Sequence, residues 1–201
     1  MKKGKAQERR QARTREAIVR AAEEIIETQG PDALNMRDVA ERIDYSASNL
    51  YEYFSGKDEL LAAVIKEALT RLTMHVRRIL TGLSPRERLQ SYGHAYLEFA
   101  RTHPQLYLVI FSRKEAPKKL TGPEETPSPY DLLREIVEEG IVAGIFTPSP
   151  DFGLHEMTFG CWSLVHGIAM LRLTMREVSW ETAFASDDQI LDRFIDGLSR
   201  H

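Results

Sequence analysis

The sequence predicts an all-α protein in which a small N-terminal three-helix domain is followed by a larger helical domain. Apolar residues recur three and four positions apart along most of the 201-residue chain, which is the spacing of one helix face. Capping residues and prolines stand where these runs begin, and no segment alternates polar with apolar residues as a half-buried strand does. A composition of 42% hydrophobic and 28% charged residues is that of a folded globular protein.

The first helix is expected to begin at Thr14 and to stop at Gly30-Pro31, because proline cannot continue the hydrogen-bond ladder. Its buried stripe is Ile18, Ala21, Ala22, Ile25 and Ile26. Asn35 offers a side-chain oxygen that can cap a second, short helix, with Asp38 in its first turn. The buried face of this second helix is expected to be Val39, Ala40 and Ile43.

A tight turn at Asp44-Tyr45 leads to a third helix, which Ser46 can cap and which is expected to extend to Phe54. Ser55 or Gly56 then opens a long helix from Lys57 towards Thr81. Its apolar stripe is Leu60, Leu61, Val64, Ile65, Ala68, Leu69, Leu72, Val76, Ile79 and Leu80. We therefore expect one domain in residues 1–56 and a second in residues 57–201.

The second domain is expected to contain several further helices. Ser84-Pro85-Arg86-Glu87 combines a capping serine, a first-turn proline and a glutamate, and it starts a helix that runs to about Arg101. The others cover 104–111, 128–144, 152–173 and a final segment that starts at a capping box, Ser186 to Gln189. The final helix buries Ile190, Leu191, Phe194, Ile195 and Leu198. Residues 114–129 hold four prolines and a glycine and are expected to form a loop.

Charge is concentrated at the N-terminus. Eight of the first 20 residues are basic and two are acidic, whereas the whole chain has a net charge of −3. A basic arm on an acidic body is expected of a protein that meets phosphate at one end, although a solvated tail would have the same composition.

Several classes of protein are excluded by what the sequence lacks. No stretch reaches the roughly 18 apolar residues of a membrane span, and no apolar run follows the N-terminal basic residues, so neither a membrane partner nor secretion is expected. The single cysteine, Cys161, cannot form an intrachain disulfide and is too few for a metal cage. We expect a cytoplasmic protein without a metal or another cofactor.

Two short helices joined by a tight turn and braced by a third form a helix-turn-helix, which sets its second helix in the DNA major groove. Small and polar residues after Ser46 let base edges approach, and Asn49 can pair with one of them. Tyrosine hydroxyls and a lysine near the next helix can meet phosphate oxygens. The expected DNA contacts are Arg13, Asn35, Arg37, Ser46, Ala47, Ser48, Asn49, Tyr51, Tyr53 and Lys57.

The same region, from about Thr14 to Leu61, resembles the DNA-binding domain of the TetR family of regulators. The resemblance rests on Arg37-Asp38-Val39-Ala40, on Ser46, and on the run Leu50-Tyr51-Glu52-Tyr53-Phe54-Ser55-Gly56-Lys57-Asp58-Glu59-Leu60. It implies a regulator that binds double-stranded operator DNA, with repression relieved by ligand as the default. The family usually has glycine at the position of Asp44, often glycine at Ser48 and commonly threonine at Asn49. Asp44 can adopt the left-handed turn that glycine favours, so these departures concern the operator sequence.

A second resemblance lies in the C-terminal half. Trp162-Ser163-Leu164-Val165-His166-Gly167 resembles the Trp-x-x-x-His-Gly signature of one class of TetR-type effector domains, and His103-Pro104-Gln105-Leu106-Tyr107 resembles their earlier helix junction. This resemblance implies a homodimer built mainly from the last two long helices and a cavity for an unknown small-molecule effector. The expected effector contacts are Tyr92, Tyr96, Phe99, Phe111, Trp162, His166 and Met170.

Simpler interpretations stay open for several of these residues. Tyr51 and Tyr53 could close the core of the small domain, and the aromatic stripe that includes Tyr92 could line a cavity or a filled core. Cys161 and His166 suggest a nucleophile and its base, but five residues place them about 140° apart around a helix, so no enzyme is expected. The alternative function is a helical small-molecule binding protein that does not act through DNA.

Overall fold

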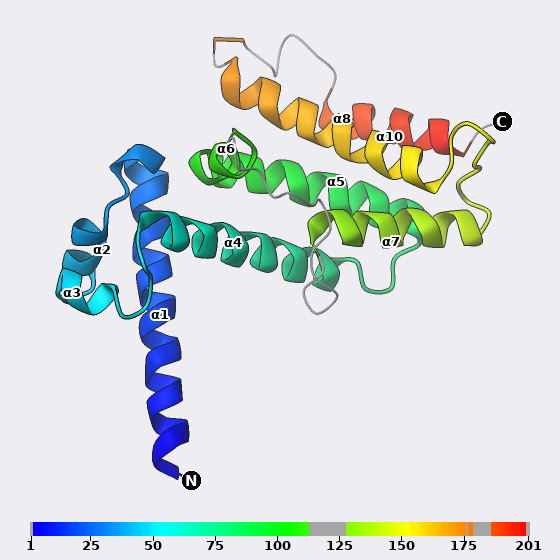
Figure 1. The fold of residues 1–201 in the computed structure, drawn as a ribbon. Helices are drawn as coiled ribbons and strands as arrows, with labels where there is room; N and C mark the ends of the chain where they lie inside the picture. Colours follow the sequence, from blue (N-terminus) through cyan, green and yellow to red (C-terminus); the bar gives the residue numbers. More distant parts are fainter. Residues whose placement is uncertain (1, 113–127, 176, 179–185, 200–201) are drawn as a thin grey trace. The chain divides into compact units, whose positions relative to one another are not determined.

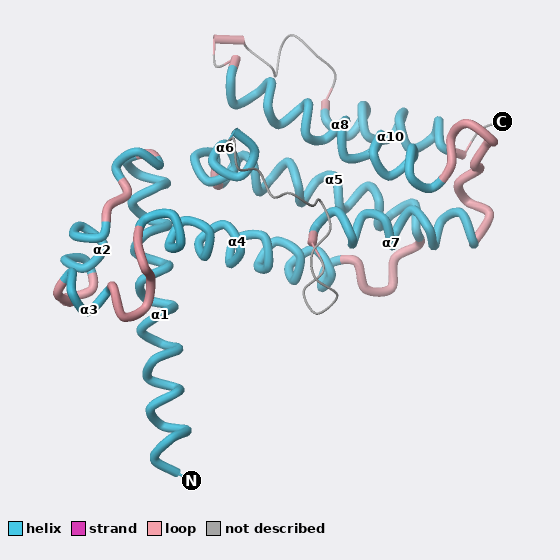
Figure 2. The backbone as a smooth tube through the Cα atoms, viewed as in Figure 1, coloured by secondary structure: helices cyan, strands magenta, loops and turns pink. Residues whose placement is uncertain are grey.

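The computed structural model describes residues 2–112, 128–175, 177–178 and 186–199 (Figure 1). All regular elements in these ranges are helical (Figure 2), apart from one isolated bridge between Ser149 and Phe152, so the expected all-α class is confirmed. Two compact units can be distinguished: one draws on residues 1–68 and 105–114, the other on 69–104 and 115–201. No helix in the described ranges has the length and apolar character to cross a membrane.

The first unit is built on a helix-turn-helix. Its elements are α1 (Lys2–Gln29), the 3-10 helix η1 (Pro31–Ala33), α2 (Met36–Arg42) and α3 (Ala47–Leu50). Helix α1 packs against η1 and α2, and α2 packs against α3. Asp44, with φ of 56°, turns the chain between α2 and α3 and is the sole non-glycine residue of the described chain with a positive φ. Aspartate thus adopts the left-handed conformation as expected.

The core of the first unit is formed by the predicted apolar faces, except that Ile43 is only partly buried. Ile18 and Ile25 of α1, Val39 of α2, Leu50 of α3 and Phe54 are all buried. Asn35 caps α2 through its Oδ1, which accepts a hydrogen bond from the Asp38 amide at 2.9 Å. The part of α6 (Pro104–Ser112) that starts at Gln105 also belongs to this unit, and the Leu106 amide donates to Glu27 Oε1 at 3.2 Å.

The second unit is a bundle around α5 (Pro85–Thr102). Its other helices are α7 (Pro129–Val142), α8 (Leu154–Thr174), α10 (Asp187–Leu198) and the end of α4 (Lys57–Ile79) from Leu69 onwards. Helix α5 packs against α7, α8 and α10, and α7 packs against α8. The capping box at Ser84 and Glu87 is present as predicted, with the Ser84 amide 2.9 Å from Glu87 Oε2.

Helices α5 and α10 run antiparallel along a polar ladder. The residue numbers on α10 fall by four as those on α5 rise by four, which is the signature of two antiparallel helix faces. The ladder consists of Arg86 with Asp196 at 2.7 Å, Gln90 with Asp192 at 2.9 Å and His94 with Asp188 at 2.7 Å. Beside it, Gly93 allows close packing, since a Cβ at this position would lie 3.0 Å from Leu191 Cδ1.

Some helix bounds differ from those predicted. Helix α1 begins at Lys2 rather than Thr14, because residues 5–13 are mostly good helix formers that can extend a packed helix. Helix α3 ends at Leu50 rather than Phe54, because the chain tightens there and the Tyr53 amide bonds to the Leu50 carbonyl three positions earlier. Of the loop expected at residues 114–129, positions 114–127 lie outside the described residues.

Candidate DNA-binding and effector-binding sites

The first residues of α3 present a polar face to solvent. The Ser46 hydroxyl accepts a hydrogen bond from the Asn49 amide at 3.3 Å and so caps the helix as predicted. Ser48 and Asn49 are exposed and Ala47 is partly exposed, whereas Leu50 is 0% exposed. The helix is therefore anchored by one apolar side chain, and its polar side chains are accessible to a partner.

The aromatic residues after α3 are divided between the surface and the core. Tyr51 is 56% exposed, Tyr53 is half-buried and Phe54 is buried. Tyr51 therefore does not close the core of this unit, and its phenol is accessible to an acceptor such as a phosphate oxygen. The guanidinium of Arg15 lies 4.6 Å from the centre of the Phe54 ring, a contact between residues far apart in the sequence that no local pattern indicates.

Besides Ser46, two of the residues expected at DNA have side-chain partners inside the unit. The Asn35 amide nitrogen donates to Ala33 O at 3.2 Å and to Asp38 Oδ2 at 2.8 Å, besides the cap made by its oxygen. Lys57 Nζ donates to Asp32 O at 3.3 Å. Arg13 and Arg37 are exposed. All ten expected residues stay predictions as DNA contacts, and Asn35 has a defined structural role.

A second candidate site lies around the hydroxyl of Tyr96 on α5. The indole Nε1 of Trp162 on α8 donates to Tyr96 Oη at 3.2 Å, and the same oxygen lies 3.3 Å from Nδ1 of His166. The Trp162 and His166 rings are stacked with centroids 5.2 Å apart, and Tyr130 of α7 meets Trp162 edge-on at 6.0 Å. The structure thus brings together three expected effector residues and adds Tyr130, which the sequence analysis did not single out.

Tyr92 joins the same aromatic layer but is fixed by a structural hydrogen bond. Its hydroxyl donates to the carbonyl of Pro129 at 2.9 Å, and its ring stacks on Tyr96 with centroids 6.3 Å apart. Burial raises the pKa of Tyr92 well above its ordinary value, so the phenol stays protonated and keeps donating to α7.

The other expected effector residues are Phe99, Phe111 and Met170. Phe99 packs against His103 at 5.3 Å between ring centroids. Phe111 belongs to the first unit and packs against Tyr107 at 4.7 Å. Met170 is half-buried on α8, one turn beyond His166. Their role in effector binding stays a prediction.

Burial governs the ionisation of the groups near this cluster. It raises the pKa of the Cys161 thiol to about 12, so the sulfur carries no thiolate near neutral pH and is a poor nucleophile. It lowers the pKa of His166, which favours the neutral imidazole. The cluster is thus an aromatic surface with a neutral hydrogen-bonding chain rather than a nucleophile and base.

The cluster is closed at its centre and partly open at its edge. Tyr96 is 3% exposed, whereas Trp162 and His166 are only half-buried. An open hollow on the surface of α7 is lined by Glu135, Glu138, Glu139, Val142 and Ala143, and none of the expected effector residues borders it. The Trp162 and His166 rings are therefore the accessible part of the cluster.

A tight turn, an outward-facing short helix and a bracing α1, followed by a separate helical bundle, define a helix-turn-helix transcriptional regulator. Residues 18–64 match the family described as "Bacterial regulatory proteins, tetR family", and residues 89–198 match "Tetracyclin repressor-like, C-terminal domain". Since the second match alone covers more than half of the chain, the protein belongs to the TetR family of regulators.

Named relatives agree with this family. The chain is 35% identical over 92 residues to the HTH-type transcriptional activator FasR of Mycolicibacterium smegmatis, a match that covers 45% of this chain and 42% of FasR. It is 27% identical over 150 residues to the repressor KstR2 of the same organism, covering 71% and 72% of the two chains. A protein of unknown function from Rhodococcus sp. RHA1 has a similar structure, with a TM-score of 0.74, 25% identity and coverage of 92% and 95%.

Proposed function

We propose that this chain is a cytoplasmic homodimeric repressor that binds operator DNA through α3 and is released by a small-molecule effector, without enzymatic activity. The observation that carries the proposal is the outward face of α3, where Ser48 and Asn49 are exposed while Leu50 is buried. Repression is proposed because the named repressor KstR2 aligns over 71% of this chain, whereas the activator FasR aligns over 45%.

Each proposed DNA contact has a distinct task. Asn49 would pair with a base edge in the major groove, since asparagine can bond two groups of one adenine. Tyr51 and Tyr53 would donate to phosphate oxygens and hold the helix in register. Arg13 and Arg37 are exposed cations of the same unit and would add charge to those contacts.

The dimer would form through an exposed stripe on α8. Phe159, Ser163, Gly167 and Leu171 follow one another at intervals of four, so they share one helix face. Phe159 is 50% exposed and Leu171 is 49% exposed, while a Cβ on Gly167 would meet nothing within 4 Å. An apolar stripe with small residues in its middle is suited to pack closely against a second copy of itself around a two-fold axis.

The effector would bind against Trp162 and His166, in a domain of the Trp-x-x-x-His-Gly class. Stacked aromatic rings favour an apolar or flat body, and the hydrogen-bonded chain from Trp162 through Tyr96 to His166 favours a ligand with at least one polar group. The neutral imidazole makes an uncharged acceptor or donor a better match than a free anion.

Release from the operator would follow from a change in the distance between the two recognition helices. Two recognition helices can enter successive major grooves only when they are held about 34 Å apart. Helix α4 runs from the first unit into the second, so an effector that favours one direction of α4 would change this separation. The free energy of operator binding would then become less favourable. The change is at most the difference between the effector's binding free energies for the DNA-binding state and for the released state.

The test is selection of bound sequences from random duplex DNA with the full chain, followed by gel-shift titration of the best sequence. The proposal requires a pseudo-palindromic sequence, as expected for a two-fold dimer, and a complex that small apolar molecules from a screening library dissociate. Failure to enrich any sequence, together with binding of such molecules, would favour the small-molecule binding protein instead. A reporter gene behind the selected sequence separates repression from activation.

A further inference from the structure

The N-terminal end of α1 extends beyond the domain that it braces. The first buried residue of α1 is Thr14, and all residues from Lys5 to Arg13 are exposed. At about 1.5 Å per residue this extension adds roughly 12 Å of helix that packs against no other element in the described part of the chain. Figure 1 shows it as the blue end of α1, projecting past α2 and α3.

The extension has no face suited to pack on protein. Its sequence, KAQERRQAR, contains no apolar side chain larger than alanine. It holds the cations Lys5, Arg9, Arg10 and Arg13 but only one anion, Glu8, and none of the four cations forms an ion pair within the part of the chain that the structure describes. A helical segment of this kind gains little from its own side chains and is suited to a polyanion.

The position at which the extension leaves the domain indicates that the polyanion is DNA. Thr14, directly after Arg13, has its Oγ1 3.4 Å from Tyr45 Oη in the turn before α3. Tyr45 precedes Ser46, the cap of α3, so the extension emerges beside the end of α3 that reads bases. Lys5, Arg9 and Arg13 are four residues apart and lie on one side of α1.

We propose that residues 5–13 of α1 form a second DNA-contacting element, which lies along the sugar-phosphate backbone next to the half-site that α3 reads. The inference rests on the proposed function and deepens it. Cations about 6 Å apart along one helix face can each reach a phosphate, because one strand presents a phosphate every ~3.4 Å of helix axis. The extension thus adds contacts that are independent of sequence and lengthens the protected DNA by about three to four base pairs on each side.

The test compares the full chain with the triple variant Lys5→Gln, Arg9→Gln and Arg10→Gln, which keeps the helix formers and leaves Arg13 in place. Loss of three phosphate contacts makes the salt dependence weaker: the negative slope of log affinity against log salt decreases in magnitude by up to about 2.7 per protomer. We expect the slope to be smaller in magnitude by about 1.8 to 2.7 per protomer, where the lower figure counts only Lys5 and Arg9, which share a helix face with Arg13. We also expect a hydroxyl-radical footprint shortened at its outer edges and an unchanged ratio of operator to random-DNA affinity. A lysine variant, Arg9→Lys with Arg10→Lys, is expected to keep the unaltered slope.

The matched control removes three exposed arginines from the second unit, Arg78→Gln, Arg101→Gln and Arg134→Gln, with the same change in net charge. It is expected to leave the slope and the footprint as they are. An unchanged slope in the N-terminal variant, an equal fall in the control, or tighter binding by the N-terminal variant overturns this inference alone. Absence of any complex with the unaltered chain overturns the proposed function and this inference together.

Discussion

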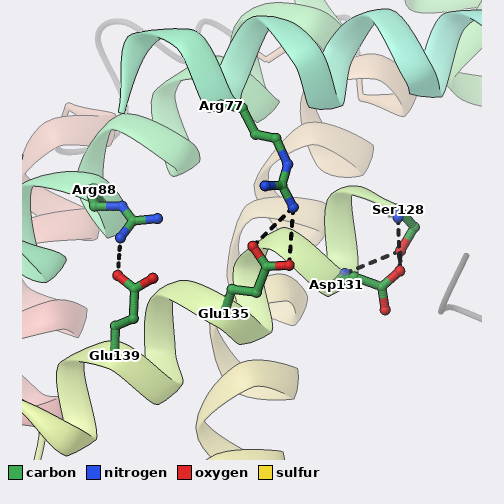
Figure 3. Close-up of polar contacts among 6 residues, drawn as sticks. All are labelled: Arg77, Arg88, Ser128, Asp131, Glu135 and Glu139. Carbon is green, nitrogen blue, oxygen red and sulfur yellow. Dashed lines mark hydrogen bonds and ion pairs between the residues drawn. The ribbon is translucent and has the colours of Figure 1, made fainter. Parts of the chain in front are cut away.

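Arg77 of α4 and Glu135 of α7 form a two-point ion pair, with Arg77 Nη2 3.0 Å from each carboxylate oxygen (Figure 3). One turn further along α7, Glu139 accepts a hydrogen bond from Arg88 of α5 (Figure 3). Glu135 and Glu139 lie on one face of α7, one turn apart, so this face is joined to α4 by the first residue and to α5 by the second.

The other end of α7 is fixed by its cap and by the aromatic cluster. Ser128 and Asp131 form a capping box, in which the Ser128 amide lies 2.8 Å from Asp131 Oδ2 (Figure 3). Tyr130, within this first turn, meets Trp162 edge-on. A displacement of Trp162 would thus act on α7, and the ion pair would connect α7 to α4 within the second unit.

We expect the Arg77 and Glu135 side chains to be energetically coupled. Both are partly exposed, at 44% and 42% of the side chain, so the coupling free energy in a double-mutant cycle should be about 0.3–1 kcal/mol rather than the larger value of a buried pair. Urea denaturation of Arg77→Ala, Glu135→Ala and the double variant measures it. The more exposed Arg101 and Glu98 pair on α5 serves as the control and should give a smaller coupling; additive single effects at Arg77 and Glu135 would show that the pair contributes nothing.

Gly140 on α7 is required by the packing of Phe146. A Cβ at position 140 would lie 2.1 Å from Phe146 Cδ2, and this ring is buried. Gly140→Ala is therefore expected to lower the free energy of unfolding by about 1–3 kcal/mol, as measured by urea denaturation. Gly197→Ala on α10 is the matched control, because a Cβ there meets nothing within 4 Å; it should be neutral or stabilising by up to about 1 kcal/mol. Equal effects of the two variants would contradict the packing argument.

The fold was predictable from sequence where local chemistry decides it. The caps at Asn35, Ser46 and Ser84 and the turn at Asp44 depend on residues at most a few positions apart, and all are present. The ion pair of Arg77 with a residue 58 positions away was not predictable, because helical periodicity gives the face of a helix but not the helix that covers it.

In the candidate sites, too, some features follow from the local sequence and others depend on tertiary packing. Leu50 is the one apolar residue that buries the short helix α3, so the sequence pattern predicted that Ser48 and Asn49 would be exposed. Helical spacing points to Tyr96 and a family resemblance points to Trp162, and the structure joins the two residues across 66 positions. Periodicity could not show that Phe111 belongs to the other compact unit, since only tertiary packing determines this.

Asn49 and Tyr51 should affect DNA binding in different ways. Asn49→Ala removes a base contact, so we expect operator affinity to fall by about 1–3 kcal/mol while affinity for random DNA stays the same. Tyr51→Phe removes only a hydroxyl that would donate to phosphate, so it should weaken both complexes by the same factor. Competition gel shifts with operator and random duplexes measure both affinities. If Asn49→Ala weakens both duplexes equally, Asn49 does not read a base.

Burial of His166 predicts a dependence of stability on pH. Its folded-state pKa is lower than the ordinary value of 6.5 because of desolvation, so the unfolded chain binds a proton more readily than the folded chain. Stability is therefore lost as the pH falls below the unfolded pKa towards the folded one. We expect His166→Gln to lose less stability than the unaltered chain between about pH 7.5 and about pH 5.5 in urea denaturation. Identical pH profiles of the two proteins would mean that His166 is as solvated as in the unfolded chain.

The stripe on α8 predicts which substitution separates the subunits. Leu171→Glu places a carboxylate at the C-terminal end of the stripe, inside the proposed interface, where removal from water without a partner costs several kcal/mol. We expect light scattering after gel filtration to give the monomer mass of 23.0 kDa for this variant and about twice that mass for the unaltered chain. Val142→Glu is the matched control, because Val142 is a more exposed apolar residue, on α7, and its substitution should leave the dimer intact. A monomer from Val142→Glu and a dimer from Leu171→Glu would move the interface to α7, and the spacing of the two recognition helices would then depend on α7 rather than on α8.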